Sequence, residues 1–279
     1  MKKKITILEE NGTTTVKYSD TRFANNEDKK HDVAFQYNRN DIENYIINDA
    51  IASDGKKITY FSKIPDIRNK PESERTENEQ QLLAEFENMI DNAIAAGLDY
   101  GVDPKAIIAI IQREVTFQGL NTRKDVCTSK GKGYMQITSK PIKDFLGYYS
   151  EKDKNGNIQT GYRMIKTWYY GQEMAELLES RGFNVTTAKT RDEKDKLAEQ
   201  IENYLIANED HDFNIRFGTL VLRRYMDTTN GDLKKAAYKY NNNATHRENY
   251  QKHVGEIYNV LNKNLALKPE YKFEIQTRT

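Results

Sequence analysis

The sequence predicts a mainly helical protein in which a small α+β element precedes one large helical domain. From about residue 81 onward, apolar residues recur at the three- and four-residue spacings of amphipathic helices. Short alternating runs, which are typical of strands, are concentrated in about the first 65 residues. The chain of 279 residues is long enough to bury a substantial core.

The composition excludes several classes of partner and site. The 43 basic and 42 acidic residues give a net charge of +1, so no global field attracts nucleic acid or an anionic membrane. No stretch approaches transmembrane length. Cys127 is the single cysteine and the four histidines are scattered, so we expect no disulfide, no metal and no cofactor.

The start of the chain lacks a clear secretory signal. Lys2–Lys4 is basic, but the apolar run behind it covers only residues 5–8 and ends at Glu9. This pattern agrees with a phage or mobile-element protein, with another export route, or with a leader that has been removed.

Residues 1–65 are predicted to form the α+β element. Asn11-Gly12 is a hairpin turn signal between alternating strands. A third strand, a short helix capped by Asp41 and a last strand are expected to follow. Nothing in this element carries a recognisable chemistry, so a wall-binding module, an assembly contact and a brace for the next domain remain open. The expected segments are strands at 5–8, 13–18, 33–37 and 58–61, and a helix near 41–46.

The helical domain is predicted over residues 81–264, after a polar linker at 66–80. It includes a long inserted segment, 148–212, with an Asn-Gly turn at 155–156. A tail with weak strand character follows at 265–279. The expected helices are 82–93 with an end near Gly97, 103–117, 162–180, 191–207, 213–226, 233–240 and one around 250–258.

Glu114 lies within the apolar stripe of the helix predicted at 103–117. Asp103 is a good N-cap and Pro104 suits the first helical position. A carboxylate in an apolar stripe is costly unless it is paired or protonated, and burial raises its pKa toward the range useful for a general acid. A structural explanation is also open, in which a buried Lys or Arg holds Glu114 or the side chain lies at the edge of the stripe.

Two further stretches contain candidate functional residues. The polar loop 118–132 contains Cys127, which has no neighbouring histidine to activate it, and Ser129. It leads into Gly133-Tyr134-Met135-Gln136-Ile137-Thr138, where a glycine permits close backbone approach to a ligand or a tight turn. Each stretch on its own also fits an ordinary loop or the start of a regular element.

The order of these pieces resembles the soluble-type lytic transglycosylases (the SLT domain), which have a goose-lysozyme-like fold. The resemblance covers about residues 80–262 and implies a lysozyme-like domain acting on peptidoglycan. The motifs are a helix ending in Glu, G-Y-M-Q-I-T, N-I-x-x-G, A-Y-x-Y-N and a late Tyr.

The resemblance implies a role for each matched position. Glu114 corresponds to the family's single catalytic acid, and Asn214 and Gly218 to the helix behind the sugar groove. The residues implied in substrate binding are Gly133, Tyr134, Met135, Gln136, Tyr240, Asn241, Tyr250 and, in the loop, Ser129. The chain departs from the family at Val115, where serine is usual, and at Asn243, where glycine is common.

The resemblance also implies the reaction. A conventional glycosidase needs two carboxyl groups, and no second acid occupies a motif position; Asp125 and Asp144 lie in polar surroundings. The family's route uses one acid to cleave the bond between N-acetylmuramic acid and N-acetylglucosamine and to form a 1,6-anhydro end, without metal or cofactor. It places the activity at the cell wall, in remodelling, secretion or phage entry and release.

Two alternatives remain open at this point. One is a lysozyme-type muramidase that hydrolyses the same bond with a positioned water. The other is an inactive peptidoglycan-binding or assembly protein on the same fold, which Val115 and Asn243 would favour.

Overall fold

A computed structural model describes residues 3–20, 31–117, 131–152, 157–162, 169–207, 210–241 and 245–263. It is mainly helical, with a small antiparallel sheet at the N-terminus, as the sequence predicts. No helix in these ranges is both long enough and apolar enough to cross a membrane. Ser129, Asn243, Cys127 and the 155–156 turn lie outside the described residues, as does the predicted tail.

The N-terminal sheet has the strand order β1-β2-β3, with β1 at Lys4–Glu10, β2 at Thr13–Asp20 and β3 at His31–Asn38. Asn11 and Gly12 both have positive φ, which matches the twist that a two-residue hairpin needs. Val16 stands opposite Phe35, and both side chains are buried in the main core. The predicted hairpin and third strand are therefore confirmed.

The chain between the sheet and the long helices differs from the prediction. Helix α1 (Arg39–Asn44) begins at the N-cap Asn38 rather than at Asp41 and continues into a π-helix, η1, at Tyr45–Asp49. The strand predicted at 58–61 is wrong: the stretch is irregular and passes into a turn, and Phe61 is buried against Phe86. Part of the stretch expected as a linker is helical, since α2 spans Ile64–Asn69 and a 3₁₀ turn, η2, spans Glu72–Glu74.

Helix α4 (Pro104–Val115) forms the centre of the helical body. It packs on α3 (Glu77–Tyr100) and α10 (Arg247–Leu261), while α8 (His211–Asp227) packs on α3 and α9 (Leu233–Tyr240). The isoleucines on all sides of α4 are fully buried, including those outside the predicted apolar stripe. Helix α3 continues through Gly97, where an end was expected, and stops at Gly101 in the left-handed conformation.

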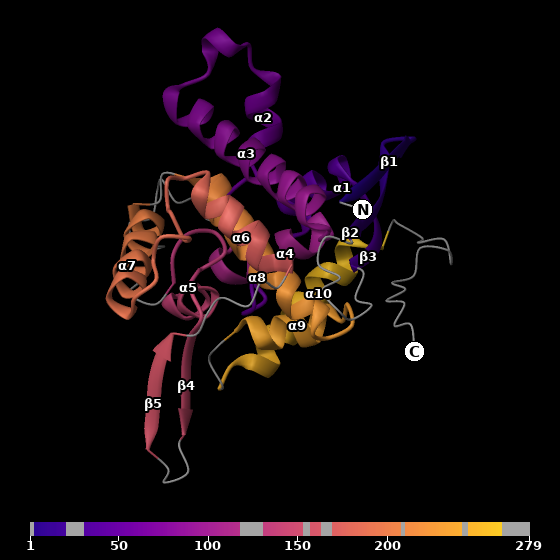
Figure 1. The fold of residues 1–279 in the computed structure, drawn as a ribbon. Helices are drawn as coiled ribbons and strands as arrows, with labels where there is room; N and C mark the ends of the chain where they lie inside the picture. Colours follow the sequence, from indigo (N-terminus) through magenta and orange to yellow (C-terminus); the bar gives the residue numbers. More distant parts are fainter. Residues whose placement is uncertain are drawn as a thin grey trace.

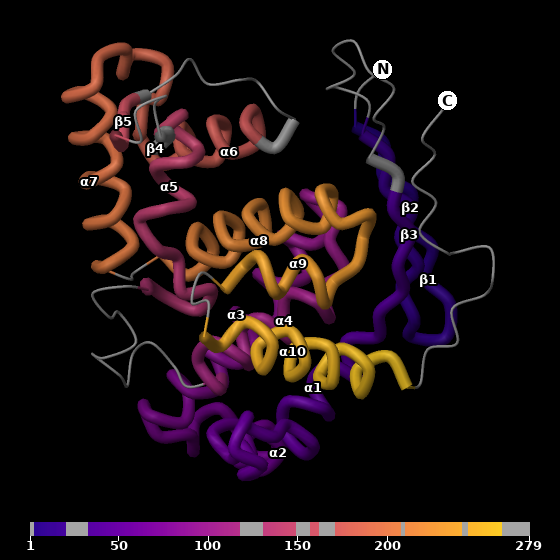
Figure 2. Tube along the Cα trace, turned by 90° about the horizontal axis from the view of Figure 1, so that it is seen from below, coloured from indigo at the N-terminus to yellow at the C-terminus, as the bar shows by residue number. Residues whose placement is uncertain are grey.

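The inserted segment contains the expected helices α6 (Tyr169–Glu179) and α7 (Arg191–Ala207). It also contains a hairpin of β4 (Tyr148–Lys152) and β5 (Ile158–Tyr162), which the sequence did not predict as strands. The short helix α5 (Ser139–Phe145) precedes this hairpin. The β4–β5 hairpin and α7 of the inserted segment lie on the other side of the helical body from the N-terminal sheet (Figures 1 and 2), whereas α6 reaches β2 through Glu173 and Tyr18.

The N-terminal sheet shares a single hydrophobic core with the helices. Buried polar contacts reinforce this packing at two places. Arg223 of α8 donates to Glu173 of α6 at 2.7 Å and to the Tyr18 hydroxyl of β2 at 3.3 Å. Lys105 of α4 donates to the Gln36 carbonyl of β3 and to the Asn262 side chain beyond α10. The sheet is therefore built into the helical body.

Candidate active site

Glu114 lies in the last turn of α4, at the point where this central helix meets solvent. The helix begins as predicted, with the Asp103 side chain accepting a hydrogen bond from the Lys105 amide at 2.9 Å. It ends because Thr116 and Phe117 both adopt left-handed φ, at 51° and 56°. Two consecutive non-glycine residues in this region are costly, and such strain is concentrated at functional sites. Glu114 is only partly exposed, while most of α4 is fully buried.

The Glu114 carboxyl group has one hydrogen-bond partner among the described residues. The hydroxyl of Tyr250, a side chain that is 3% exposed, donates to Glu114 Oε1 at 2.6 Å. Burial raises the pKa of Glu114 to about 7, and the Tyr250 hydrogen bond and the Arg113 charge act in the opposite direction. Within the described ranges no Lys or Arg forms an ion pair with Glu114, so the structural explanation of a salt-bridged acid is not supported.

The G-Y-M-Q stretch forms a tight turn beside α8. An isolated bridge joins Lys132 to Ile137, and Gly133 has φ of +68°. The Asn214 side chain accepts from the Met135 amide and donates to the Lys132 carbonyl, each at 2.9 Å. Asn214 thus holds the turn from both sides, which gives a physical reason for the N-I-x-x-G motif.

Gly133→Ala is expected to destabilise the protein by about 2–4 kcal/mol. A Cβ at this position would overlap with the side-chain amide of Asn214. Left-handed alanine costs roughly 1–2 kcal/mol, and displacing Asn214 adds about 1 kcal/mol for each hydrogen bond lost. Gly182→Ala is the matched control, because Gly182 has φ of +82° and no atom within 4 Å of the added Cβ. If Gly133→Ala and Gly182→Ala lose the same free energy of unfolding in urea denaturation, Asn214 does not fix the turn.

Tyr240 connects this turn to Glu114. Its hydroxyl donates to the Met135 carbonyl at 2.8 Å. Burial, followed by the negative charge of Glu114, raises the pKa of Tyr240 well above its usual value, so the phenol and the carboxyl are near neighbours. The structure therefore brings together Glu114, Tyr240, Tyr250 and the backbone of the G-Y-M-Q turn.

The remaining predicted residues occupy different surroundings. Tyr134 and Met135 are 1% and 0% exposed, and the Tyr134 hydroxyl donates to Glu85 at 2.9 Å, so the structure buries both of these residues. Gln136 is partly exposed and donates to the Gly133 carbonyl at 2.9 Å. Asn241 is partly exposed, and its carbonyl accepts from Arg247 at 2.9 Å.

The candidate second acids do not complete a pair with Glu114. Asp144 is on α5, 3.1 Å from Lys140 and 3.6 Å from Arg224, and Asp125 lies outside the described residues. Within the described ranges no acidic side chain hydrogen-bonds to Tyr240, and the only acid that bonds to the Tyr250 hydroxyl is Glu114. These same ranges hold no cluster of His, Cys, Asp and Glu suited to a metal.

Sequence reasoning did not assign a role to Arg113. Its guanidinium lies 5.2 Å from the centroid of the Tyr250 ring. The only available signal was a basic residue directly before a candidate acid.

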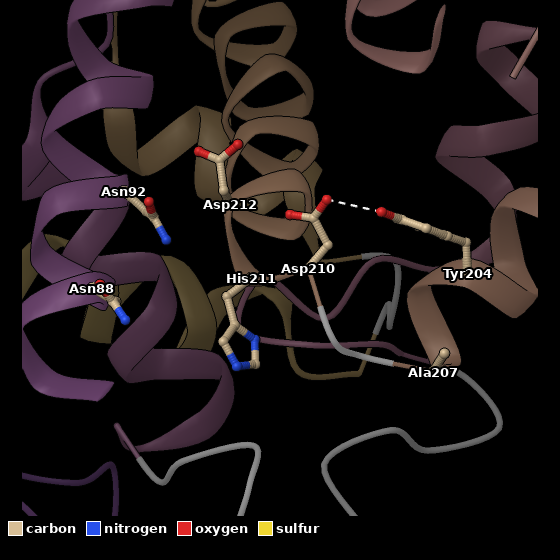
Figure 3. Close-up of a pocket in the computed structure, with 7 residues that line it drawn as sticks. All are labelled: Asn88, Asn92, Tyr204, Ala207, Asp210, His211 and Asp212. Atoms are coloured by element: carbon tan, nitrogen blue, oxygen red, sulfur yellow. Dashed lines mark hydrogen bonds between the residues drawn. The ribbon is translucent and has the colours of Figure 1, made fainter. Parts of the chain in front are cut away.

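A separate pocket of about 510 Å³ lies between α3, α7 and the start of α8 (Figure 3). Its two carboxylates already have partners: Asp210 accepts from Tyr204 at 2.9 Å and from Arg181, and Asp212 accepts from Arg216. Glu114 does not line this pocket, so it is not the candidate active site. The lining residues are Asn88, Asn92, Tyr204, Ala207, Asp210, His211 and Asp212.

Comparison of the chain with protein-family models, with curated proteins and with solved structures finds no match.

Proposed function

We propose that this chain is a peptidoglycan lytic transglycosylase with a lysozyme-like domain. The observation that carries the proposal is a single acid, Glu114, whose pKa is raised to about 7 and whose hydrogen-bond partner is a buried tyrosine. A protonated carboxyl group at neutral pH can serve as a general acid. The ordered motifs around it, including Asn214 holding the G-Y-M-Q turn, support the same assignment.

The proposed reaction needs no second carboxylate. Glu114 donates its proton to the glycosidic oxygen, and the bond from that oxygen to C1 of N-acetylmuramic acid breaks. The acetamido group of the same sugar stabilises the cation at C1. The C6 hydroxyl then attacks C1 and gives its proton to the Glu114 carboxylate, which closes the 1,6-anhydro ring and restores the acid. No water, metal or organic cofactor is consumed.

The surroundings of Glu114 suit this sequence of steps. Tyr250 donates to the carboxyl group and would stabilise its charged form between the two proton transfers. The Tyr240 hydroxyl donates to the Met135 carbonyl, so Tyr240 fixes the G-Y-M-Q turn, which in this proposal lies beneath the sugar. In this proposal the N-terminal sheet braces the helical body, and the protein acts at the cell wall.

Mass analysis of digested peptidoglycan tests the function. Anhydro-muropeptides, each one water lighter than the reducing-end product, would establish the lyase. Reducing-end muropeptides would instead indicate a muramidase that positions a water. Wall binding without release of fragments would leave an inactive binding protein on this fold.

The rate of cleavage is expected to fall as pH rises through about 7. Only protonated Glu114 can begin the reaction, and burial raises its pKa from 4.5 to about 7. The value of kcat/KM should be constant in the acid range and fall about tenfold per pH unit in the alkaline range. Measurement of kcat/KM as a function of pH, with soluble glycan strands as substrate, tests this prediction. A decline centred near the ordinary value of a glutamate would contradict the assignment of Glu114.

A further inference from the structure

Arg113 and Glu114 are neighbours in α4, and both contact Tyr250 of α10. The Arg113 guanidinium lies 5.2 Å from the Tyr250 ring centroid, and the Tyr250 hydroxyl donates to Glu114 Oε1 at 2.6 Å. The three side chains are in contact in the order Arg113, Tyr250, Glu114. The ring is buried, so its position depends on what packs against its two faces.

Arg113 forms no ion pair with a carboxylate within the described ranges, unlike three other arginines that are half-buried or buried. Arg181, Arg216 and Arg223 each form ion pairs at 2.8 Å or less. Arg113 Nε is buried and has no hydrogen-bond acceptor. Leaving a guanidinium donor unsatisfied costs free energy, which the contact with the aromatic ring offsets only in part. This cost at a position next to the candidate acid indicates a function for the charge.

We propose that Arg113 is a positioning residue that holds the Tyr250 ring against Glu114 and stabilises the Glu114 carboxylate after it has given up its proton. The inference deepens the proposed function, because the carboxylate stage arises only if Glu114 acts first as acid and then as base. Arg113 itself need not touch the substrate. It acts through Tyr250 and through its charge.

The titratable groups around Glu114 agree with this role. Arg113 comes from the same helix, Tyr250 from α10 and Tyr240 from α9. Burial raises the pKa of Glu114, while Tyr250 and Arg113 lower it. Burial, followed by the charges of Glu114 and Tyr240, raises the pKa of Tyr250 well above its usual value, and the Arg113 charge lowers it. Burial, with a contribution from the Arg113 charge, lowers the pKa of His253, so this ring one turn beyond Tyr250 adds no competing charge at neutral pH.

The test compares Arg113→Met with Arg113→Lys in the full chain. Arg113→Met removes the positive charge and keeps an apolar side chain. Arg113→Lys keeps the positive charge and loses the planar guanidinium group that stacks on the Tyr250 ring. The Glu114 pKa is measured by carbon NMR of its carboxyl group, which is assigned by its disappearance in Glu114→Gln. We expect the Glu114 pKa to rise in Arg113→Met and to stay close to the native value in Arg113→Lys. We also expect kcat on glycan strands to fall roughly three- to tenfold in Arg113→Met with KM unchanged.

Two further variants separate positioning from general stability. In a Tyr250→Phe background the fall in kcat caused by Arg113→Met should become smaller, because the path through the Tyr250 hydroxyl is already broken and only the direct effect of the Arg113 charge remains. Lys252→Met is the matched control: it removes an exposed positive charge from α10, where Lys252 pairs only with Glu256 at 3.9 Å. It should change neither the Glu114 pKa nor kcat.

The NMR measurement needs no catalytic activity, so the two proposals fail separately. If the native protein cleaves nothing and the Glu114 pKa still rises in Arg113→Met, the proposed lytic transglycosylase function is overturned and the effect of Arg113 on Glu114 is supported. An unchanged Glu114 pKa in Arg113→Met would overturn the role of Arg113 whether or not the protein cleaves. A fall in kcat of the same size in Arg113→Met and in Lys252→Met would also overturn it.

Discussion

Glu114→Gln is expected to lower the rate of peptidoglycan cleavage by roughly 10²–10⁴-fold, the contribution of a positioned general acid. Glutamine has the shape of glutamic acid, and its amide oxygen can still accept the Tyr250 hydrogen bond, now 2.6 Å to Oε1. It cannot give a proton to the glycosidic oxygen or take one from the C6 hydroxyl. The variant should therefore fold, bind glycan strands and fail at both proton transfers. The rate of muropeptide release by equal amounts of folded protein measures the effect.

Glu43→Gln is the matched control for this substitution. Glu43 is also largely buried, but it accepts hydrogen bonds from Arg39 at 2.8 Å and Arg68 at 2.6 Å in the N-terminal part of the chain. Its replacement should lower stability and leave cleavage intact. Equal activity of Glu114→Gln and the native protein, with both variants folded, would exclude Glu114 as the acid and with it the proposed mechanism.

The local signals around α4 were sufficient to place Glu114. An N-cap aspartate and a proline fix the start of the helix, and the buried isoleucines identify its environment. The end of the helix could not be predicted in detail. Thr116 and Phe117 are not residues that favour the left-handed region, so their positive φ comes from tertiary contacts, including the full burial of Phe117.

The side-chain orientations in the G-Y-M-Q turn also could not be predicted from the sequence. The motif marks the turn, but it does not say that Tyr134 reaches Glu85 or that Met135 packs on Gly218. Both features depend on helices that are distant in sequence. The β4–β5 hairpin was missed for the opposite reason: Ile158 is 68% exposed, so the strand lacks the buried alternating face that identifies strands in a sequence.

The N-terminal sheet could be predicted as strands but not as a brace. Alternation at Val33, Phe35 and Tyr37 shows that one face is buried, without saying what covers it. The buried arginine that joins this sheet to α6 and α8 lies more than 200 residues away from Tyr18. A contact of such long sequence separation leaves no local pattern.

Arg223→Met is expected to destabilise the whole protein by about 3–5 kcal/mol, the cost of breaking a buried ion pair from one side. Arg223 is 0% exposed and lies 2.7 Å from Glu173 and 4.0 Å from Asp20, both nearly fully buried. Methionine fills much of the volume but leaves the two acids without their cation. Arg191→Met, at an exposed ion pair of 3.6 Å on α7, should change stability by less than about 0.5 kcal/mol.

The loss in Arg223→Met should also depend on pH in a defined direction. Without the Arg223 cation, ionisation of the buried acids Asp20 and Glu173 costs more free energy, so the loss of stability grows as pH rises through the range in which carboxyl groups ionise. The deficit measured by urea denaturation should therefore be larger at about pH 8 than at about pH 5. Adding Asp20→Asn and Glu173→Gln should recover part of the loss and remove most of this pH dependence. Because the sheet and the helices share one hydrophobic core, strands and helices should still unfold in one transition. An early, separate loss of the sheet with the helices unaffected would show that residues 1–65 form an independent module.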